Sequence, residues 1–275
     1  MLKRAPLRMK PLTPLYDAHC HLADSRLAPY STEIASSLRA IKCGSSIVNG
    51  TSPADWSAVR CYAKSHPNAL PAIGLHPWQV NSAAHDWQSR FLKALDHGVR
   101  IVGEIGLDQW ISDHDIEAQQ MAFKWQLAEA AKRNLPVSIH CLKAIDSLMK
   151  TLRVVEQPQR GIHLHALNIS VEAARQLIEM GAYFSFNSGQ LKPNAKHIYD
   201  LIRAIPDDRI LIETDAPDFL PRPEHRAYAL PEIGLNHPAN LVASYRSIAA
   251  VRQQTFEELS YVVAANFNRY FINES

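Results

Sequence analysis

The sequence has few cysteines, no long apolar run and no strong excess of either charge, and each absence excludes a class of protein. The four cysteines are scattered without a CxxC pair, so we expect ordinary thiols rather than a disulfide framework. No stretch approaches the roughly 20 apolar residues that a membrane-spanning helix needs. The formal charge of +2 does not by itself indicate a nucleic-acid partner. The sequence therefore predicts a cytoplasmic protein with no membrane segment.

The chain also lacks a secretory signal and a linker that would divide it. Residues 1–14, MLKRAPLRMKPLTP, are basic but have no apolar segment of the kind found in signal peptides. We expect them to form a flexible arm. No Gly-rich tract, repeat or low-complexity segment interrupts the rest of the chain. A barrel domain typically needs about 250 residues, so we expect a single domain over residues 15–275.

What the sequence does contain is a regular alternation of short apolar runs with longer helical patterns. Eight runs, most of them rich in Ile, Val and Leu, resemble strands buried on both faces; they lie at 15–19, 45–50, 70–75, 100–107, 136–141, 161–166, 182–187 and 209–215. Apolar residues recur at helical spacing in 33–42, 53–66, 86–97, 115–134, 171–180, 194–204, 239–252 and 256–271. Strands that alternate with helices are parallel and have right-handed crossovers. The pattern predicts an α/β fold, a (β/α)8 TIM barrel, with an open doubly wound sheet as the alternative.

Polar side chains interrupt or follow two of these apolar runs. His19 and His21 follow the first run and, being two residues apart on an extended chain, point to the same side, where both imidazoles can meet one metal ion. Asp17 shares that side and could fix the tautomer of an imidazole. Glu104 stands in an apolar strand, where a lone buried carboxylate is costly unless it is paired or metal-bound. Taken singly, these residues are equally consistent with polar turn residues or with a salt bridge to a neighbouring strand.

Three further runs carry a histidine or an aspartate at or next to their last position. His140 is the last residue but one of the fifth run and Asp215 is the last of the eighth, and each alone is more often a hydrogen-bonded core or loop residue. The sixth run offers two histidines on one face. We prefer His165 because it lies nearer the C-terminal end of its strand, where barrel active sites form. His163 is then a hydrogen-bonded interior residue or a group that orients a ligand.

The coincidence of these residues at strand ends predicts a metal-dependent hydrolase. Active sites of barrels are assembled from several strand ends at one face. Four imidazoles and two carboxylates suit a two-metal hydrolase better than a structural zinc site, which is closed and usually carries thiolates. Asp215 could also take the proton of the attacking water. We expect Glu104 to bridge two divalent ions, one held by His19, His21 and Asp215 and the other by His140 and His165.

At these residues the chain resembles the TatD-type metal-dependent deoxyribonucleases, a branch of the amidohydrolase superfamily. The matching segments occur in family order and span almost the whole chain; they are DAHCHL (17–22), GLHPW (74–78), VGEIGLD (102–108), PVSIHC (136–141), IHLHAL (162–167), ETDAPDFLP (213–221), HPANL (237–241) and NFNRYF (266–271). VGEIGLD and ETDAP together are highly specific, whereas HxH alone is not. The resemblance implies a (β/α)8 fold, divalent metal ions and hydrolysis of DNA, often from an end. It also gives Glu104 the bridging place.

Residues at the mouth of such a barrel could contact the substrate. His76 matches a motif histidine of the family, and we interpret it as a phosphate contact or a general acid, with a loop histidine as the plain alternative. Trp78 and Trp110 follow strand ends and could stack on unpaired bases, although such tryptophans more often only pack. Family members commonly carry an Arg after the His-Cys of the fifth strand, where this chain has Leu142 followed by Lys143. Lys143 is therefore a candidate phosphate contact.

Two other segments depart from the family pattern. Leu235-Asn236-His237-Pro238 stands where Arg-Asn-Glu-Pro is frequent, and His165-Ala166-Leu167 replaces a His-Cys-Phe or His-Ser-Phe. The metal ligands are complete, but part of the expected phosphate-binding and stacking residues has changed. Other cations that could supply the missing charge are Lys192, Arg222 and Arg226.

The sequence therefore predicts an exonuclease that acts on single-stranded DNA with two divalent ions, which could be Zn²⁺, Mn²⁺ or Mg²⁺. One alternative, motivated by the missing arginines, is a metal-dependent hydrolase of an ester or amide that is not a nucleic acid. The other is a nuclease subunit controlled by a partner protein.

Overall fold

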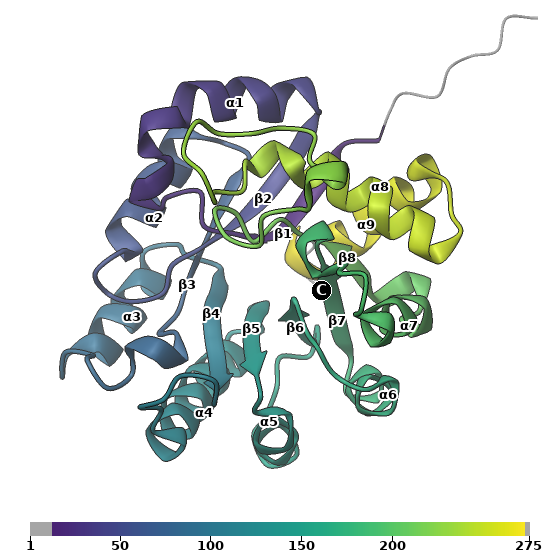
Figure 1. Ribbon diagram of the computed structural model, residues 1–275. Coiled ribbons are helices and arrows are strands. Elements are labelled where there is room, and N and C mark those ends of the chain that lie inside the picture. Colours follow the sequence, from purple (N-terminus) through teal and green to yellow (C-terminus); the bar gives the residue numbers. More distant parts are fainter. Residues whose placement is uncertain (1–12, 273–275) are drawn as a thin grey trace, which may run out of the picture.

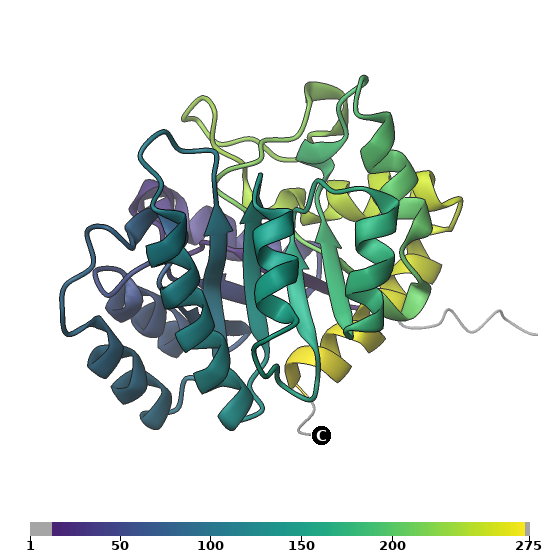
Figure 2. The same cartoon turned by 90° about the horizontal axis from the view of Figure 1, so that it is seen from below.

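Eight parallel strands form a ring in the computed structural model, which describes residues 13–272 (Figure 1). Each strand pairs with the next one along the chain, and helices cover the outside of the ring (Figures 1 and 2). The predicted arm lies outside the described residues except for positions 13 and 14. The strands are β1 (Leu15–Cys20), β2 (Cys43–Asn49), β3 (Ala69–Ile73), β4 (Ile101–Asp108), β5 (Val137–Leu142), β6 (Ile162–His165), β7 (Ala182–Phe186) and β8 (Ile210–Ile212).

The ring closes where the end of β1 meets the residues after β8. The backbone N–H of Asp215 donates to the carbonyl oxygen of His19 at 3.0 Å, and the N–H of His21 donates to the carbonyl oxygen of Ala216 at 2.7 Å. The architecture is a single (β/α)8 TIM barrel, which confirms the predicted fold class. The open doubly wound sheet was the wrong alternative.

Every predicted helical segment is helical, with ends that differ by a few residues. The helices are α1 (Ser31–Ala40), α2 (Trp56–Ser65), α3 (Trp87–Asp96), α4 (Ile116–Lys132), α5 (Ile145–Leu152), α6 (Val171–Glu179), α7 (Lys196–Ala204), α8 (Leu241–Arg252) and α9 (Phe256–Phe267). Short 3-10 turns lie at 25–30, 77–79, 188–190, 207–209, 223–225 and 238–240, and a π-helical turn lies at 268–272. Helix α5 was not predicted. It has only eight residues, of which Leu148, Met149 and Leu152 pack into the core.

Five strands end earlier than predicted, and after two of them, β6 and β8, a residue with left-handed backbone follows at the mouth of the barrel. The predicted strand 209–215 is β8, which ends at Ile212, and Asp215 has a φ of +51°. The predicted strand 161–166 is β6, which ends at His165, and Ala166 has a φ of +44°. A left-handed residue cannot continue a strand. These turns let the last polar side chains of the strands gather over the mouth.

The other end of the barrel is filled by Tyr270, which lies in the π-helical turn Asn268–Ile272. Its buried hydroxyl donates to the carbonyl oxygen of Val137 at 2.8 Å and accepts from the N–H of Val137 at 2.9 Å, at the start of β5. The interior is thus a packed core, as is usual in this fold. Within residues 13–272, no helix is long and apolar enough to cross a membrane.

Candidate metal centre

The six residues predicted as metal ligands lie together at the C-terminal ends of the strands. Glu104, from β4, is at the centre, with only 3% of its surface exposed. Its two carboxylate oxygens face two different groups of side chains. The other five residues come from the end of β1, from β5 and β6, and from the turn after β8; they are His19, His21, His140, His165 and Asp215.

The first group surrounds Oε2 of Glu104. His19 Nε2 and His21 Nε2 each lie 3.5 Å from this oxygen. Oδ1 of Asp215 is 3.6 Å from His19 Nε2 and 3.4 Å from His21 Nε2. Four ligand atoms therefore face a common point.

The separations within this group fit a bound cation better than direct hydrogen bonds. Ligand atoms about 2.0–2.1 Å from a tetrahedral zinc ion lie about 3.3–3.4 Å from one another, whereas charged N–H···O bonds measure about 2.7–2.9 Å. His19 Nε2 is buried and has no hydrogen-bond partner. Buried polar atoms normally have a partner, so this nitrogen, facing two carboxylates, is consistent with a metal position.

The second group surrounds the other oxygen of Glu104. Oε1 is 2.8 Å from His165 Nε2 and 3.0 Å from His140 Nδ1. These two nitrogens are 3.3 Å apart. Each oxygen of Glu104 thus faces its own group, and the two contacts of Oε1 have the length of direct hydrogen bonds. The buried clusters are consistent with a binuclear metal site.

The outer nitrogens of two imidazoles show which ring nitrogen is free for a cation. His21 Nδ1 donates to the carbonyl oxygen of Asn49 at 3.0 Å, so in the neutral ring Nε2 carries the lone pair. His140 Nε2 donates to Oδ2 of Asp108 at 2.8 Å, so in the neutral ring Nδ1 carries the lone pair. Partners of this kind fix the tautomer of metal-binding histidines. In both residues the free lone pair points toward Glu104.

His76 differs from these two histidines. Its Nε2 lies 3.4 Å from Oε1 of Glu104, but its Nδ1 accepts a hydrogen bond from the N–H of Trp78 at 3.2 Å. Burial lowers the pKa of His76, and the neutral ring must then carry its proton on Nε2. His76 therefore presents a donor to the site rather than a lone pair.

Burial and neighbouring charges shift the pKa values in this cluster. Burial by itself raises the pKa of Glu104, but the imidazoles of His76 and His165 outweigh it and hold the pKa well below its usual value. Burial lowers the pKa of His19 far below its usual value, so the ring stays neutral, as a metal ligand must. Burial also raises the pKa of Asp215. The site thus combines an ionised carboxylate with a second carboxylate of greater basicity.

Two other polar residues singled out in the sequence lie outside the ligand groups. His163 Nε2 is 2.6 Å from the hydroxyl of Ser185, which in turn donates to Glu213. Asp17 does not contact an imidazole, contrary to our expectation. Its carboxylate accepts from the N–H of Thr214 at 3.0 Å and from the hydroxyl of Thr214 at 2.6 Å. Asp17 therefore ties β1 to the end of β8 instead of orienting a ligand.

Asp108 is a functional candidate that the sequence reasoning missed. Its Oδ2 accepts from His140 Nε2 at 2.8 Å and from the indole Nε1 of Trp78 at 2.7 Å, and its Oδ1 accepts from the N–H of Trp110 at 2.7 Å. One buried carboxylate thus joins a predicted ligand to both tryptophans. Asp108 stands four residues after Glu104 in one strand, and even spacing places side chains on the same face. That spacing was the available signal.

An open cavity of about 730 Å³ leads to the ligand groups. Trp78 and Trp110 line it with 48% and 58% of their surfaces exposed. Both rings are therefore accessible from the cavity, and base stacking on them stays a prediction. Lys143 is not among the described residues that line the cavity, whereas Lys192 is. Lys143 has a φ of +53° at the turn between β5 and α5. Of the two lysines considered in the sequence, Lys192 is therefore the one that lines the cavity, and a phosphate contact by Lys143 stays a prediction.

Comparison with known proteins gives a match over nearly the whole chain. A family model described as TatD related DNase matches residues 16–272. The chain is 27% identical over 259 residues to the uncharacterized metal-dependent hydrolase YabD of Bacillus subtilis, covering 94% of this chain and 98% of that protein. It is 26% identical over 263 residues to the 3'-5' ssDNA/RNA exonuclease TatD of Klebsiella pneumoniae, covering 94% and 97% of the two chains.

Solved structures show the same architecture. The crystal structure of YjjV, a TatD homolog from Escherichia coli, has a TM-score of 0.83 at 26% identity and covers 94% of this chain and 98% of that one. A TatD family hydrolase from Entamoeba histolytica has a TM-score of 0.82 at 18% identity, covering 96% and 100% of the two chains. At that lower identity the likeness supports the fold alone.

Proposed function

Because the chain belongs to the TatD-related DNase family, we propose that it is a metal-dependent exonuclease that hydrolyses phosphodiester bonds at the ends of single-stranded DNA. The family match supports the reaction class. The relative named as a 3'-5' ssDNA/RNA exonuclease supports the substrate and the attack from an end.

The observation that carries this proposal is the position of Glu104 between two groups of imidazoles. Oε2 faces His19 and His21 at 3.5 Å, and Oε1 faces His140 and His165 at 3.0 and 2.8 Å. Two divalent ions held there would supply Lewis-acid activation of the phosphate and of a water molecule. Imidazole and carboxylate donors suit Zn²⁺ or Mn²⁺, and a loosely held Mg²⁺ also fits phosphoester chemistry.

Side chains of the protein then position the substrate and move the proton. Asp215, whose Oδ1 lies 3.6 and 3.4 Å from His19 Nε2 and His21 Nε2, takes the proton that the attacking water loses. His76 donates from Nε2 to an oxygen of the phosphate, since its tautomer is fixed by the N–H of Trp78. Trp78 and Trp110 offer their exposed faces to unpaired bases.

The test is metal analysis of the purified protein followed by an assay with end-labelled oligonucleotides in Mg²⁺, Mn²⁺ and Zn²⁺. We expect about two ions per chain and a ladder of products that shortens from one end of a single strand. Glu104→Ala serves as the inactive control. A single internal cut, or an intact oligonucleotide in all three metals, would contradict the proposal.

A second candidate is a metal-dependent hydrolase of another ester or an amide. Leu142 favours it, because it lines the cavity where family members commonly carry an arginine. Turnover of a small ester or amide by a protein that leaves every oligonucleotide intact would establish this alternative. Activity that appears only after addition of a second protein would point to a partner-controlled subunit.

A further inference from the structure

The cavity that leads to the metal ligands carries little positive charge for a site proposed to hold DNA. Apart from the ligand groups, its charged lining residues are Asp24, Arg26, Lys192 and Asp218. Two carboxylates and two cations have a formal sum of zero. Proteins gain electrostatic affinity for nucleic acids from Lys and Arg that neutralise phosphates. Contacts other than charge must therefore contribute much of the binding.

Arg26 is already engaged by the two carboxylates. Its Nη1 and Nη2 lie 3.0 and 2.9 Å from the two oxygens of Asp218. Its Nε and Nη2 contact the carboxylate of Asp24 at 3.1 and 2.7 Å. The three side chains together carry a net charge of −1, so a phosphate would have to displace a carboxylate to reach Arg26.

Lys192 differs from Arg26 in this respect. It lies in the loop between the 3-10 turn Ser188–Gln190 and α7, and its side chain is exposed at the cavity. Among the described residues it has no carboxylate partner, so its ammonium group is free to bind a phosphate. Within the described part of the chain, the cavity therefore offers one available cation for a contact outside the metal centre.

Three exposed aromatic side chains line the same cavity, compared with one available cation. Trp78, Trp110 and Phe219 line the cavity with 48%, 58% and 43% of their surfaces exposed. The indole of Trp78 is fixed by its bond to Asp108, which also accepts from the backbone N–H of Trp110. Rigid exposed rings lose little entropy when a base stacks on them, and every base has a face to offer.

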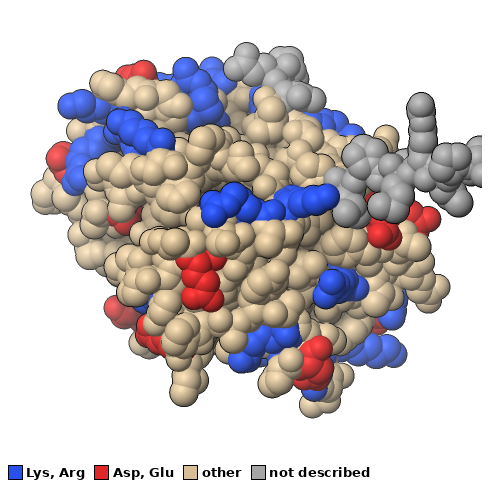
Figure 3. Space-filling model, turned by 90° about the horizontal axis from the view of Figure 1, so that it is seen from above, with Lys and Arg blue, Asp and Glu red and all other residues tan. Residues whose placement is uncertain are grey.

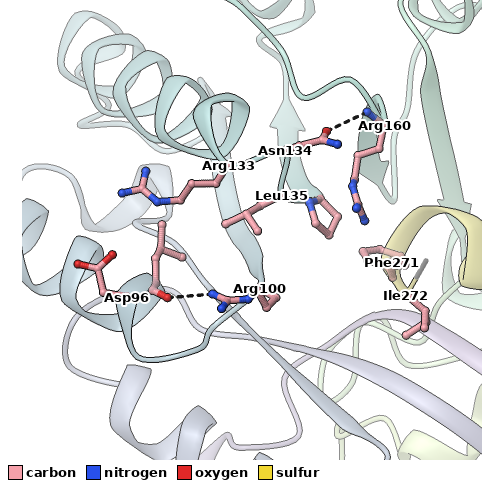
Figure 4. A pocket seen from close by; sticks show the side chains of 10 residues that line it. Asp96, Arg100, Arg133, Asn134, Leu135, Arg160, Phe271 and Ile272 are labelled. Atoms are coloured by element: carbon pink, nitrogen blue, oxygen red, sulfur yellow. Dashed lines mark hydrogen bonds between the residues drawn. The ribbon is translucent and has the colours of Figure 1, made fainter. Parts of the chain in front are cut away.

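The arginines of the barrel ends gather elsewhere. Arg100, Arg133 and Arg160 line a hollow of about 660 Å³ beside the residues that precede β4, β5 and β6 (Figure 4). Those residues lie at the N-terminal ends of the strands, whereas the metal ligands lie at the C-terminal ends. On the face shown in Figure 3, Lys and Arg form separate groups with acidic side chains among them.

We propose that this site recognises the last nucleotides of a single strand by base stacking on Trp78 and Trp110 and by one phosphate contact with Lys192. The inference rests on the proposed nuclease function and names how its substrate is held. The substrate class is a short or frayed single-stranded end with unpaired bases. Lys192 then supplies the charge that Leu142 lacks, and Trp110 sets the preference for unpaired bases.

The salt dependence of the association constant reports how many phosphates the protein neutralises. The metal-loaded full chain is titrated with a short fluorescent oligothymidylate whose phosphorothioate linkages slow cleavage, at about 50 to 200 mM salt. The logarithm of the association constant falls with a slope of about −0.7 per neutralised phosphate of a single strand. We expect about −1.4, from one phosphate at the metal centre and one at Lys192. Lys192→Gln should bring the slope to about −0.7, whereas Lys150→Gln, a control at an exposed lysine of α5 that does not line the cavity, should leave it unchanged.

A second titration measures stacking. Replacing one stacked terminal nucleotide by an abasic unit should weaken binding by about 5- to 150-fold. Trp110→Leu should weaken binding of the base-bearing strand by a similar factor and leave binding of the abasic strand unchanged. Trp110→Phe, which keeps an aromatic ring, should retain most of the affinity.

The outcomes separate this inference from the nuclease function. A wild-type slope of about −3 or steeper, or the same slope in Lys192→Gln, would overturn the single phosphate contact. Equal affinity for abasic and base-bearing strands would overturn stacking. If the protein still cleaves oligonucleotides in either case, the nuclease function stands and only this inference fails. Absence of both binding and cleavage would remove both.

Discussion

Replacing Asp108 by asparagine tests whether a residue outside the ligand groups sets the strength of metal binding. The carboxylate accepts three hydrogen bonds, from His140 Nε2, from Trp78 Nε1 and from the N–H of Trp110. An amide has one accepting oxygen and an NH₂ group that accepts none. The amide in this variant could therefore keep either the two bonds now made at Oδ2 or the one at Oδ1, and each arrangement leaves at least one of the three donors without its present partner.

The expected size of the effect follows from those bonds. An unsatisfied buried donor costs about 1–3 kcal/mol, and loss of the carboxylate beside a metal-binding imidazole typically weakens metal affinity by about 10- to 100-fold. We expect Asp108→Asn to lower metal affinity within that range and to alter the fluorescence of Trp78. Removing the bond to His140 also frees its ring to rotate away from Glu104.

The assay is competition for the metal with a chelator, with elemental analysis of the protein after dialysis. Circular dichroism shows whether the variant is folded. Asp113→Asn changes an exposed aspartate close by in the chain and serves as the control. Unchanged metal affinity in a folded Asp108→Asn protein whose tryptophan fluorescence has shifted would refute the reasoning, because the bond would be broken without consequence for the metal.

Three further variants test other parts of the account. Glu104→Ala should abolish turnover and lower the content of both ions, because one carboxylate faces both groups; full activity would remove Glu104 from the site. His163→Ala should keep more activity than His165→Ala, and the reverse ranking would reassign the ligand on β6. Tyr270→Phe should lower the free energy of unfolding by about 2–4 kcal/mol, since the N–H and carbonyl of Val137 both lose their partner. A denaturant titration that shows a loss below about 0.5 kcal/mol, the size expected of an ordinary surface substitution, would contradict this.

The alternation of strands and helices was readable from the sequence because its signals are local. Apolar runs and helical spacing are set by neighbours within a few residues. Helix α5 was not predicted because its eight residues contain little more than two turns of the helical pattern. The turns after β6 and β8 were not predicted, because Ala166 and Asp215 adopt left-handed backbone without being glycines. The residue types therefore gave no signal for these turns.

The residues that gather at the candidate metal centre were also readable, since their residue types are unusual at the ends of apolar strands. The carboxylates that hydrogen-bond to these residues were not readable from the sequence. Whether Asp17 or Asp108 orients an imidazole depends on which side chains meet across the barrel, and Asp17 bonds to Thr214 instead. Lys143 stays a prediction as a phosphate contact, and it is Lys192, the other lysine considered, that lines the cavity, because loop conformation decides which lysine lies at the mouth.

The most direct test of the central claim is anomalous diffraction from crystals grown with Mn²⁺ or Zn²⁺. The account predicts two peaks, one on each side of the Glu104 carboxylate, with that carboxylate contacting both. The residues expected around them are His19, His21 and Asp215 for one peak and His140 and His165 for the other. A single peak, or no peak among these side chains with either metal, would contradict the account.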